Sequence, residues 1–401
     1  MKVLHVIPAI APRYGGPSRA VLGMCRALHS QKVETLIATT DADGDGRLRV
    51  ALGKPIVYQD VPTIFFARQW SEAFKYSRSL KTWLEEQVKE FDAVHIHAVF
   101  SHSCLAASRA CRRWKVPYIV RPLGTLAPWS LRQKSTRKRL MWHAAIRSMM
   151  QQAAAIHYTT AAERAEVEQS LGLHRGIVIP LPIDLRTYES ASLSEGFRET
   201  FPEIGRRPYI LVMSRLHPKK ALDVLIRAFA DLVRQADLSH WRLVLAGEGE
   251  LAYTAHLRHV VQEAQIAQNV VFTGWLDGKM KLSALQQAEL LALPSYQENF
   301  GLCVIEALAC GVPVLVSPYV NLASEIDTIK AGWIADVTLA SLGDVLAEAL
   351  EKADERARRG AQGREFARRF APAQISSDLL RLYSAITKAD ISPIQKNVFE
   401  A

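Results

Sequence analysis

The alternation of two kinds of segment limits the folds open to this chain more than any other feature. Short runs of branched apolar residues alternate with stretches whose apolar residues recur at helical spacing, as in Arg19–His29. Such alternation is typical of parallel sheets with helices on both faces, so we predict an α/β fold. The expected strands are Val3–Pro8, Val33–Thr40, Thr63–Ala67, Ala93–His97, Tyr118–Arg121, Ala155–Tyr158, Gly176–Pro180, Tyr209–Ser214, Trp241–Ala246, Asn269–Thr273, Leu290–Pro294, Val312–Ser317 and Trp333–Asp336.

A proline-rich segment divides these strands into two series. Ile179–Asp184 has the composition of a linker, and 401 residues exceed what one ordinary core holds. We therefore predict one Rossmann-like domain over residues 1–186 and a second over residues 187–371. The tail, residues 372–401, has a helical pattern with no strand after it.

Basic residues are concentrated in the first half. No acidic residue occurs between Asp92 and Glu163, and the eleven cations there exceed the net charge of +10 of the whole chain. They are Arg109, Arg112, Arg113, Lys115, Arg121, Arg132, Lys134, Arg137, Lys138, Arg139 and Arg147. This excess predicts an anionic partner: lipid headgroups, nucleic acid or a phosphorylated acceptor.

Residues 131–150 narrow that choice. The sequence there predicts a helix, either an ordinary amphipathic helix or a surface that rests on anionic lipid. Its charge comes mainly from Arg132, Lys134, Arg137, Lys138 and Arg139. The segment has no interleaved aromatic platform and no nucleic-acid motif, which disfavours nucleic acid as the partner.

The cysteines and the apolar runs indicate the compartment. Five scattered cysteines with no CxxC spacing disfavour a disulfide framework and a structural zinc site, and they favour a reducing cytosol. No apolar run reaches the roughly 18–20 residues of a membrane span. Val3–Pro8 fits a first strand better than a signal peptide. We expect a cytoplasmic protein, peripheral on the inner face of the plasma membrane.

Loops at the carboxyl ends of the strands are where parallel sheets bind ligands. Gly15 and Gly16 follow the first strand and allow either close approach to a ligand or a tight turn. Arg215 and Lys220 follow the first strand of the second series and suit a departing diphosphate, although solvated surface charge is the alternative. The run 246–250, with Gly249, is either a second close approach or a plain turn.

The segment 294–313 carries the strongest signal. A strand ends at Pro294, and a helix over about Leu302–Cys310 ends before Gly311. Glu298 stands before this helix and Glu306 lies in its second turn, so both carboxylates border one pocket. Carboxylates accept paired hydrogen bonds from the hydroxyls of sugars and riboses.

This segment resembles a known signature. Glu298 and Glu306, with Phe300-Gly301-Leu302 between them, look like the E-x7-E motif of family 4 of the retaining glycosyltransferases, in glycosyltransferase group 1. The Arg215–Lys220 loop and the two glycine loops match that family in order. The resemblance implies the GT-B fold: two Rossmann-like domains facing a central cleft, an acceptor domain followed by a nucleotide-sugar domain, and a C-terminal helix crossing back to the first.

The resemblance also implies roles for individual residues. Arg215 and Lys220 hold the diphosphate, and Glu306 holds the ribose. Glu298 binds the donor sugar together with the backbone of Phe300, Gly301 and Leu302. Gly274 and Trp275 flank the base, and Gly15, Gly16 and Gly249 line the donor site. The family implies no metal and no cofactor, since Arg215 and Lys220 take the place of a cation.

One loop departs from the family pattern. Residues 121–129 lack the histidine that many relatives carry after that strand, so no side-chain catalyst is named in the first domain. His97 and Arg121 are the predicted acceptor-side residues, and His95 is predicted to be structural. Ala221 and Asn321-Leu322 stand where relatives have glycines, which affects the sugar pocket.

These expectations combine into a metal-independent, retaining hexosyltransferase. It would move a sugar from UDP or GDP to a hydroxyl of a lipid-linked or polysaccharide-precursor acceptor, in cell-surface or exopolysaccharide synthesis. The mechanism expected is front-face displacement, in which the departing phosphate takes the acceptor's proton. The alternative is a catalytically impaired homologue that binds nucleotide sugars at a membrane. A GT-B epimerase or phosphorylase is a further alternative; an NAD-dependent dehydrogenase is disfavoured.

Overall fold

A computed structural model describes residues 1–133, 135–189, 196–234 and 238–388. The chain forms two compact units. The N-terminal unit comprises Met1–Pro182 together with Phe370–Ala401, and the C-terminal unit comprises Ile183–Arg369. These boundaries fall slightly earlier than the 186 and 371 predicted from the sequence.

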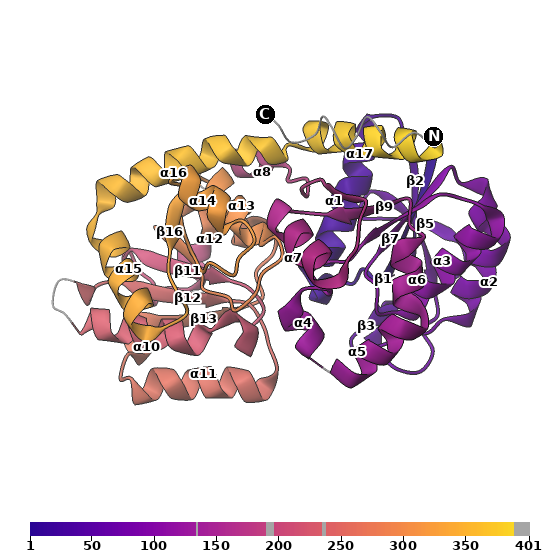
Figure 1. Ribbon diagram of the computed structural model, residues 1–401. Helices are drawn as coiled ribbons and strands as arrows, with labels where there is room; N and C mark the ends of the chain where they lie inside the picture. The colour runs from indigo at the N-terminus through magenta and orange to yellow at the C-terminus, as the bar shows by residue number, and fades with distance from the viewer. Residues whose placement is uncertain (134, 190–195, 235–237, 389–401) are drawn as a thin grey trace. The chain divides into compact units, whose positions relative to one another are not determined.

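The N-terminal unit is built on an eight-stranded sheet in the order β10-β9-β8-β7-β1-β2-β6-β5 (Figure 1). The strands are β1 (Lys2–Ala9), β2 (Glu34–Thr40), β5 (Pro55–Tyr58), β6 (Val61–Phe66), β7 (Ala93–His97), β8 (Tyr118–Arg121), β9 (Ala155–Tyr158) and β10 (Gly176–Val178). All neighbours are parallel except β5, which pairs antiparallel with β6.

Strand β5 and the hairpin of β3 (Ala42–Asp43) and β4 (Gly46–Arg47) were missed by the sequence analysis. β5 begins at a proline and lies at the sheet edge, where a missing N–H is tolerated. Its side chains are half-buried at best, so it has no apolar run of the kind that marks a central strand. The antiparallel pairing of β5 with β6 is thus an addition at the edge of the predicted parallel sheet.

Helices cover both faces of this sheet, because alternate strand residues point to opposite faces. Val3 and Ile7 of β1 pack with α1 and α17, whereas Leu4 and Val6 pack with α2 and α3. The helices of this unit are η1 (Pro12–Tyr14), α1 (Gly16–Ser30), α2 (Arg78–Gln87), η2 (Val88–Glu90), α3 (His102–Trp114), α4 (Pro128–Arg132), α5 (Ser135–Met141), η3 (Trp142–Ile146, a π-helical turn), α6 (Arg147–Gln151), α7 (Ala161–Leu171), η7 (Arg368–Phe370, at the unit boundary) and α17 (Pro372–Thr387).

The segment 131–150 is not one uniform amphipathic helix. It passes through α4, α5, the π-helical turn and α6. Ile146, Met149 and Met150 are buried in the core, whereas Leu140 is 72% exposed. Lys134 lies outside the described residues. The apolar residues therefore divide between packing on the domain and facing outward, instead of forming a single stripe.

The C-terminal unit has a six-stranded, wholly parallel sheet in the order β13-β12-β11-β14-β15-β16. The strands are β11 (Tyr209–Met213), β12 (Arg242–Ala246), β13 (Val270–Gly274), β14 (Leu290–Leu293), β15 (Val314–Val316) and β16 (Gly332–Ile334). The helices are α8 (Leu185–Glu189), α9 (Phe197–Thr200), η4 (Pro218–Lys220), α10 (Leu222–Val233), α11 (Leu251–Glu263), η6 (Ala267–Asn269), α12 (Gly278–Gln286), α13 (Leu302–Ala309), α14 (Ala323–Thr328), α15 (Leu339–Glu351) and α16 (Ala353–Ala367). The predicted α/β class is confirmed in both units.

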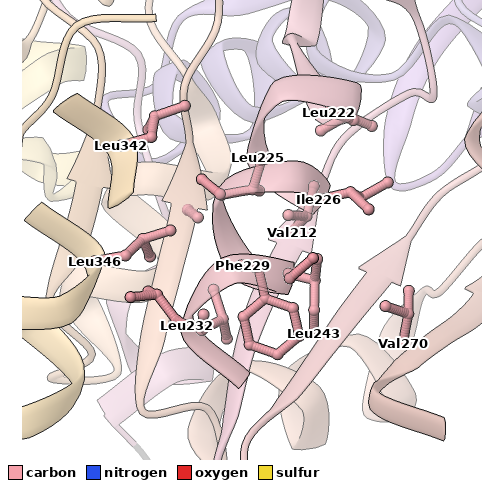
Figure 2. Packing of buried hydrophobic residues seen from close by; sticks show 14 of the residues in the cluster. Val212, Leu222, Leu225, Ile226, Phe229, Leu232, Leu243, Val270, Leu342 and Leu346 are labelled. Carbon is pink, nitrogen blue, oxygen red and sulfur yellow. The ribbon is translucent and has the colours of Figure 1, made fainter. Parts of the chain in front are cut away.

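Helix α10 shows how this second core is filled. Its residues Leu225, Phe229 and Leu232 are buried at spacings of three and four and meet Leu243 of β12 and Leu346 of α15 in one cluster (Figure 2). The helix is thereby fixed on the sheet directly after the loop 214–221, which begins at the end of β11.

Among the described residues, no helix combines the length and apolarity needed to cross a bilayer.

Helix α17 completes the core of the N-terminal unit. Leu379 is fully buried among residues of α1 and the sheet. We expect Leu379→Ala to lower the free energy of unfolding of this unit by about 2–5 kcal/mol, because it leaves a cavity. Gln374→Ala, at an exposed position of the same helix, is the control and should change it by less than about 0.5 kcal/mol. Urea titration followed by circular dichroism measures both; equal effects would contradict this account of α17.

Candidate functional site

The strand order of the C-terminal sheet reverses between β11 and β14. Counted along the chain, the order is 3-2-1-4-5-6, so β11 and β14 are neighbours whose following helices lie on opposite faces of the sheet. The loops after these two strands, 214–221 and 294–301, therefore meet at the carboxyl edge, which is where sheets with this strand order bind ligands. Both loops carry predicted site residues.

Backbone hydrogen bonds hold loop 294–301 to loop 214–221 and to the segment that follows β15. The N–H of Tyr296 donates to the carbonyl of Lys219 at 2.8 Å, and the N–H of Glu298 donates to the carbonyl of Tyr319 at 3.0 Å. His217 accepts a 3.0 Å hydrogen bond from the N–H of Lys219, and Ala221 then takes a left-handed φ of 50°. The cation-bearing loop is thus held in one conformation.

Lys220 and Glu298 form an ion pair across this edge. Nζ of Lys220 contacts Oε2 of Glu298, and their side chains are 12% and 19% exposed. Burial alone would raise the pKa of Glu298. The charges of Lys220, Lys219 and Arg215 outweigh that effect and hold the pKa below its usual value. Glu298 is therefore a carboxylate at neutral pH.

Lys219 is a third cation that the sequence analysis did not select. Burial, with repulsion from Lys220 and Arg215, lowers the pKa of Lys219 to about 8, although Glu298 opposes the shift. Arg215 is exposed beside them. Three cationic side chains therefore act on one carboxylate, and the excess of positive charge suits a ligand with two or more negative charges.

Helix α13 begins beside Glu298. Gly301 is its N-cap residue, with a φ of 67° that favours glycine, and it provides no side-chain capping bond. The first N–H groups of a helix have no acceptor within the helix, and they carry the positive end of its dipole. Phe300 is buried under this turn. The start of α13 can therefore donate hydrogen bonds to an anionic or hydroxylated ligand.

Glu306 lies in the second turn of α13 and is bound by the buried Lys281 and the half-buried Tyr188. The hydroxyl of Tyr188 donates to its Oε1 at 2.9 Å, and Nζ of Lys281 forms an ion pair with the same oxygen. Neither partner was predicted. Of the two, only Lys281 leaves a sign in the sequence. It lies on α12 three and four residues before the buried Ala284 and Leu285, where an apolar residue would be expected.

The glycines at this edge have local packing roles. A Cβ on Gly247 or Gly249 would overlap the carbonyl oxygens of Ser214 or Leu216, so both glycines let loop 246–250 lie against loop 214–216. Gly274 ends β13 with a φ of 73°, and its carbonyl accepts from the N–H of Gly247 at 2.8 Å. Contact of Gly249 or Gly274 with a donor stays a prediction.

Gly15 and Gly16 lie in the other unit. Gly15 has a φ of 67° and caps α1, and Gly16 begins that helix directly after β1 and η1. The sheet order of this unit also reverses, between β1 and β7, so the glycines stand at the equivalent place of the N-terminal sheet.

The remaining predicted residues, His97 and Arg121, are buried. Nη1 of Arg121 contacts the sulfur of Met24 on α1 at 4.0 Å. Nη1 of Arg121 donates to Nδ1 of His97 at 3.3 Å, so His97 carries its proton on Nε2 and donates to Nδ1 of His5 at 3.0 Å. Contact of either residue with an acceptor stays a prediction.

A second chain of hydrogen bonds continues this network. The carbonyl of Ile179 accepts at 2.6 Å from Nε2 of His157, which leaves Nδ1 of His157 to accept from His95 at 3.2 Å. Nδ1 of His95 then accepts from the hydroxyl of Tyr383 on α17 at 2.8 Å. His95 is thus structural, as predicted, and it ties the C-terminal helix to the sheet.

The nitrogens of His5, His95 and His97 lie within 4.8 Å of one another, and this is the one group with metal-ligand spacing in the described part of the chain. The neighbouring guanidinium of Arg121 opposes a bound cation, and the ring nitrogens already bond to one another. The chemistry of this cluster fits a hydrogen-bonded core better than a metal centre.

The loop without the family histidine is held by Glu163. This buried carboxylate on α7 accepts from the N–H of Gly124 at 3.0 Å and from the N–H and hydroxyl of Thr159 at 2.9 and 3.0 Å. The sequence analysis did not select Glu163. Residues 122–125 therefore have a fixed backbone although they offer no side-chain base.

Two family models match the chain. "Glycosyl transferase 4-like domain" matches residues 15–183, and "Glycosyl transferases group 1" matches residues 195–366. Together they span most of both units. The chain belongs to the group 1 glycosyl transferases. The predicted membership of glycosyltransferase group 1 is thereby confirmed, and the retaining chemistry and the E-x7-E roles stay predictions.

Individual proteins resemble this glycosyl transferase along most of its length. The D-inositol 3-phosphate glycosyltransferase of Nocardia farcinica is 27% identical over 303 residues, which cover 74% of this chain and 66% of that protein. The matched part thus falls just short of two thirds of this relative. Anabaena HepE in complex with UDP and glucose matches with a TM-score of 0.77 and 18% identity, over 96% of this chain and 100% of that one. Sucrose-phosphate synthase of Thermosynechococcus elongatus matches with a TM-score of 0.79 and 18% identity, over 97% and 100%. The predicted GT-B fold is confirmed.

The histidine network of this glycosyl transferase predicts a pH-dependent stability. Burial lowers the pKa of His5 and of His157 to about 3, and it lowers the pKa values of His95 and His97 well below 6.5. Between these folded-state pKa values and about pH 6.5, the unfolded chain binds more protons than the folded chain. The free energy of unfolding is therefore highest above pH 6.5 and falls as the pH drops toward 3.

We expect His157→Gln to reduce the slope of unfolding free energy against pH by about 1.4 kcal/mol per pH unit between pH 4 and 6. His143→Gln, at an exposed position of the same unit, should leave the slope unchanged. Chemical denaturation at a series of pH values measures both slopes. A slope in His157→Gln equal to that of the wild type would show that His157 is not held neutral.

Proposed function

We propose that this protein is a retaining glycosyltransferase that moves a sugar from UDP or GDP to an acceptor hydroxyl without a metal ion. The observation that carries the proposal is the cluster of Arg215, Lys219 and Lys220 around Glu298 at the start of α13. A group of cations fixed at a strand-order reversal suits a diphosphate leaving group, and cationic side chains supply the charge that a metal would otherwise supply. No further cofactor is proposed.

Each part of the donor has a proposed partner. Arg215 and Lys220 bind the diphosphate, and Glu298 accepts hydrogen bonds from the sugar beside the backbone of Phe300, Gly301 and Leu302. Glu306 accepts from the ribose, and Gly274 flanks the base. The similar HepE structure, a complex with UDP and glucose, supports UDP as the nucleotide.

The proposed reaction is a front-face displacement. The bond between the anomeric carbon and the leaving phosphate oxygen breaks, and the acceptor oxygen bonds to the same face of that carbon. The departing phosphate oxygen takes the proton of the acceptor hydroxyl, so no protein base is needed. Arg215 and Lys220 stabilise the negative charge that develops on the diphosphate. Glu298 pairs with Lys220 and acts on sugar hydroxyls instead of attacking carbon.

We expect Arg215→Ala and Lys220→Ala each to lower turnover by roughly two orders of magnitude, because each removes a charge that stabilises the leaving group. Sugar donors are first selected by whether they raise the melting temperature of the protein. The turnover rate is then measured as the release of UDP or GDP from those donors. Arg206→Ala, another exposed arginine of the C-terminal unit, is the control and should be unaffected. Turnover like the wild type in both variants would exclude the clamp. Binding without any transfer would instead support the impaired, sugar-nucleotide-binding alternative.

We further propose that the acceptor is lipid-linked or a glycan precursor of the cell surface, and that the N-terminal unit rests on anionic lipid. Arg132, Arg137 and Arg139 are exposed on α4 and α5, and the apolar side chain of Leu140 is exposed next to them. Lys138 contributes less, because its ammonium donates to the carbonyl of Ser130 and lies over the ring of Phe100. Cations beside an exposed apolar residue suit the headgroup region of a membrane on the cytoplasmic side.

We expect liposome flotation to require anionic lipid and to weaken at high salt. Replacing both Arg137 and Arg139 by Glu should lower the partition coefficient at least about thirtyfold, since each basic residue contributes about 1 kcal/mol. Replacing both Arg206 and Arg207 by Glu makes the same charge change at exposed positions of the C-terminal unit and should have little effect. Equal flotation with neutral vesicles, or none at low salt, would exclude the membrane role.

A further inference from the structure

Lys281 occupies a position where the pattern of α12 favours an apolar residue. The helix buries Lys281 together with Ala284 and Leu285, three and four residues later. A lysine is almost never buried unless its charge is paired. Its place on this face therefore has a reason other than packing.

The carboxylate of Glu306 supplies the pairing. Nζ of Lys281 contacts Oε1 of Glu306, and the two side chains are 8% and 7% exposed. The hydroxyl of Tyr188 donates to the same oxygen at 2.9 Å, and the ammonium lies 5.9 Å from the centre of the Tyr188 ring. Helices α8, α12 and α13 are thus joined at one carboxylate.

Lys281 places a positive charge directly on that carboxylate. A buried carboxyl without a counter-ion takes up a proton instead of remaining charged in a medium of low polarity. A protonated carboxyl is itself a donor and has less capacity to accept. Only the ionised form accepts from both hydroxyls of a neighbouring diol, such as the 2′- and 3′-hydroxyls of a ribose.

We propose that Lys281 is a positioning residue of the donor site, which keeps Glu306 ionised and oriented as the acceptor of a ribose diol. The inference rests on the proposed role of Glu306 in donor binding and extends it. Lys281 acts through Glu306 and needs no contact with the nucleotide. Tyr188 orients the same oxygen with a neutral hydroxyl, so it affects geometry and not charge.

Nucleotide affinity measured against pH tests the proposal. The dissociation constants of UDP and GDP are measured by calorimetry from about pH 6 to about pH 8.5. At each pH, the dissociation constant of the variant is divided by that of the wild type. Titration of the nucleotide phosphates and of Lys219 cancels in this ratio. For Lys281→Met the ratio should be largest at low pH and fall by up to about tenfold per pH unit as Glu306 ionises. For Lys281→Arg, which restores the charge, it should be flat.

Three further variants separate charge from geometry. Tyr188→Phe should give a uniform change in affinity with no dependence on pH. The double variant Lys281→Met with Glu306→Gln should also be flat, because nothing is left to ionise. Lys281→Gln replaces Lys281→Met if that variant does not fold, and the same pH dependence is expected of it.

Two outcomes contradict different claims. A flat ratio for Lys281→Met and Lys281→Gln, while Glu306→Gln still weakens nucleotide binding, would overturn the role of Lys281 and leave the donor site intact. Wild-type protein that binds neither nucleotide, or affinity unchanged by Glu306→Gln, would contradict the proposed donor site itself.

Discussion

The reversal of strand order between β11 and β14 is the constraint on which the candidate site depends. Neighbouring parallel strands whose helices lie on opposite faces place their two loops next to each other at the carboxyl edge, where ligands bind. One of these loops brings Arg215 and Lys220, and the other brings Glu298 and the start of α13. The ion pair of Lys220 with Glu298 then links two segments that are 78 residues apart in the chain. The strand order brings the charges of Lys220 and Glu298 together, because no single segment of the chain contains both.

The sequence could predict the features that repeat along it. Strand periodicity gave every strand of the C-terminal sheet to within about two residues, and the Glu298–Glu306 segment gave the family. Short edge elements such as β5 were not predicted, because they lack an apolar run and form only by pairing with the strand beside them. Local pattern is therefore a good guide to central strands and a poor one to edges.

The partners of the candidate site residues could not be predicted in the same way. Lys219 and Lys281 acquire their character from burial and from carboxylates that lie far away in sequence, and Glu163 acquires its role from a loop 39 residues distant. A lysine in an apolar helical stripe is the one local sign of such a partner. The burial of His97 and Arg121 could not be predicted for the related reason that strand position does not tell which helices will cover a face. Pairwise contacts across the fold decide these cases.

The N-terminal unit is discontinuous in the chain, and this has a consequence for its synthesis. A ribosome makes β1 and α1 first but makes α17 only after the whole C-terminal unit. Until then, the apolar surface that receives Ile375, Leu379 and Leu382 stays uncovered, and His95 lacks the hydroxyl of Tyr383. The first unit to leave the ribosome is thus the last to complete its core. A nascent chain of this protein therefore exposes a defined apolar surface, of the kind that chaperones bind, while almost two hundred further residues are translated.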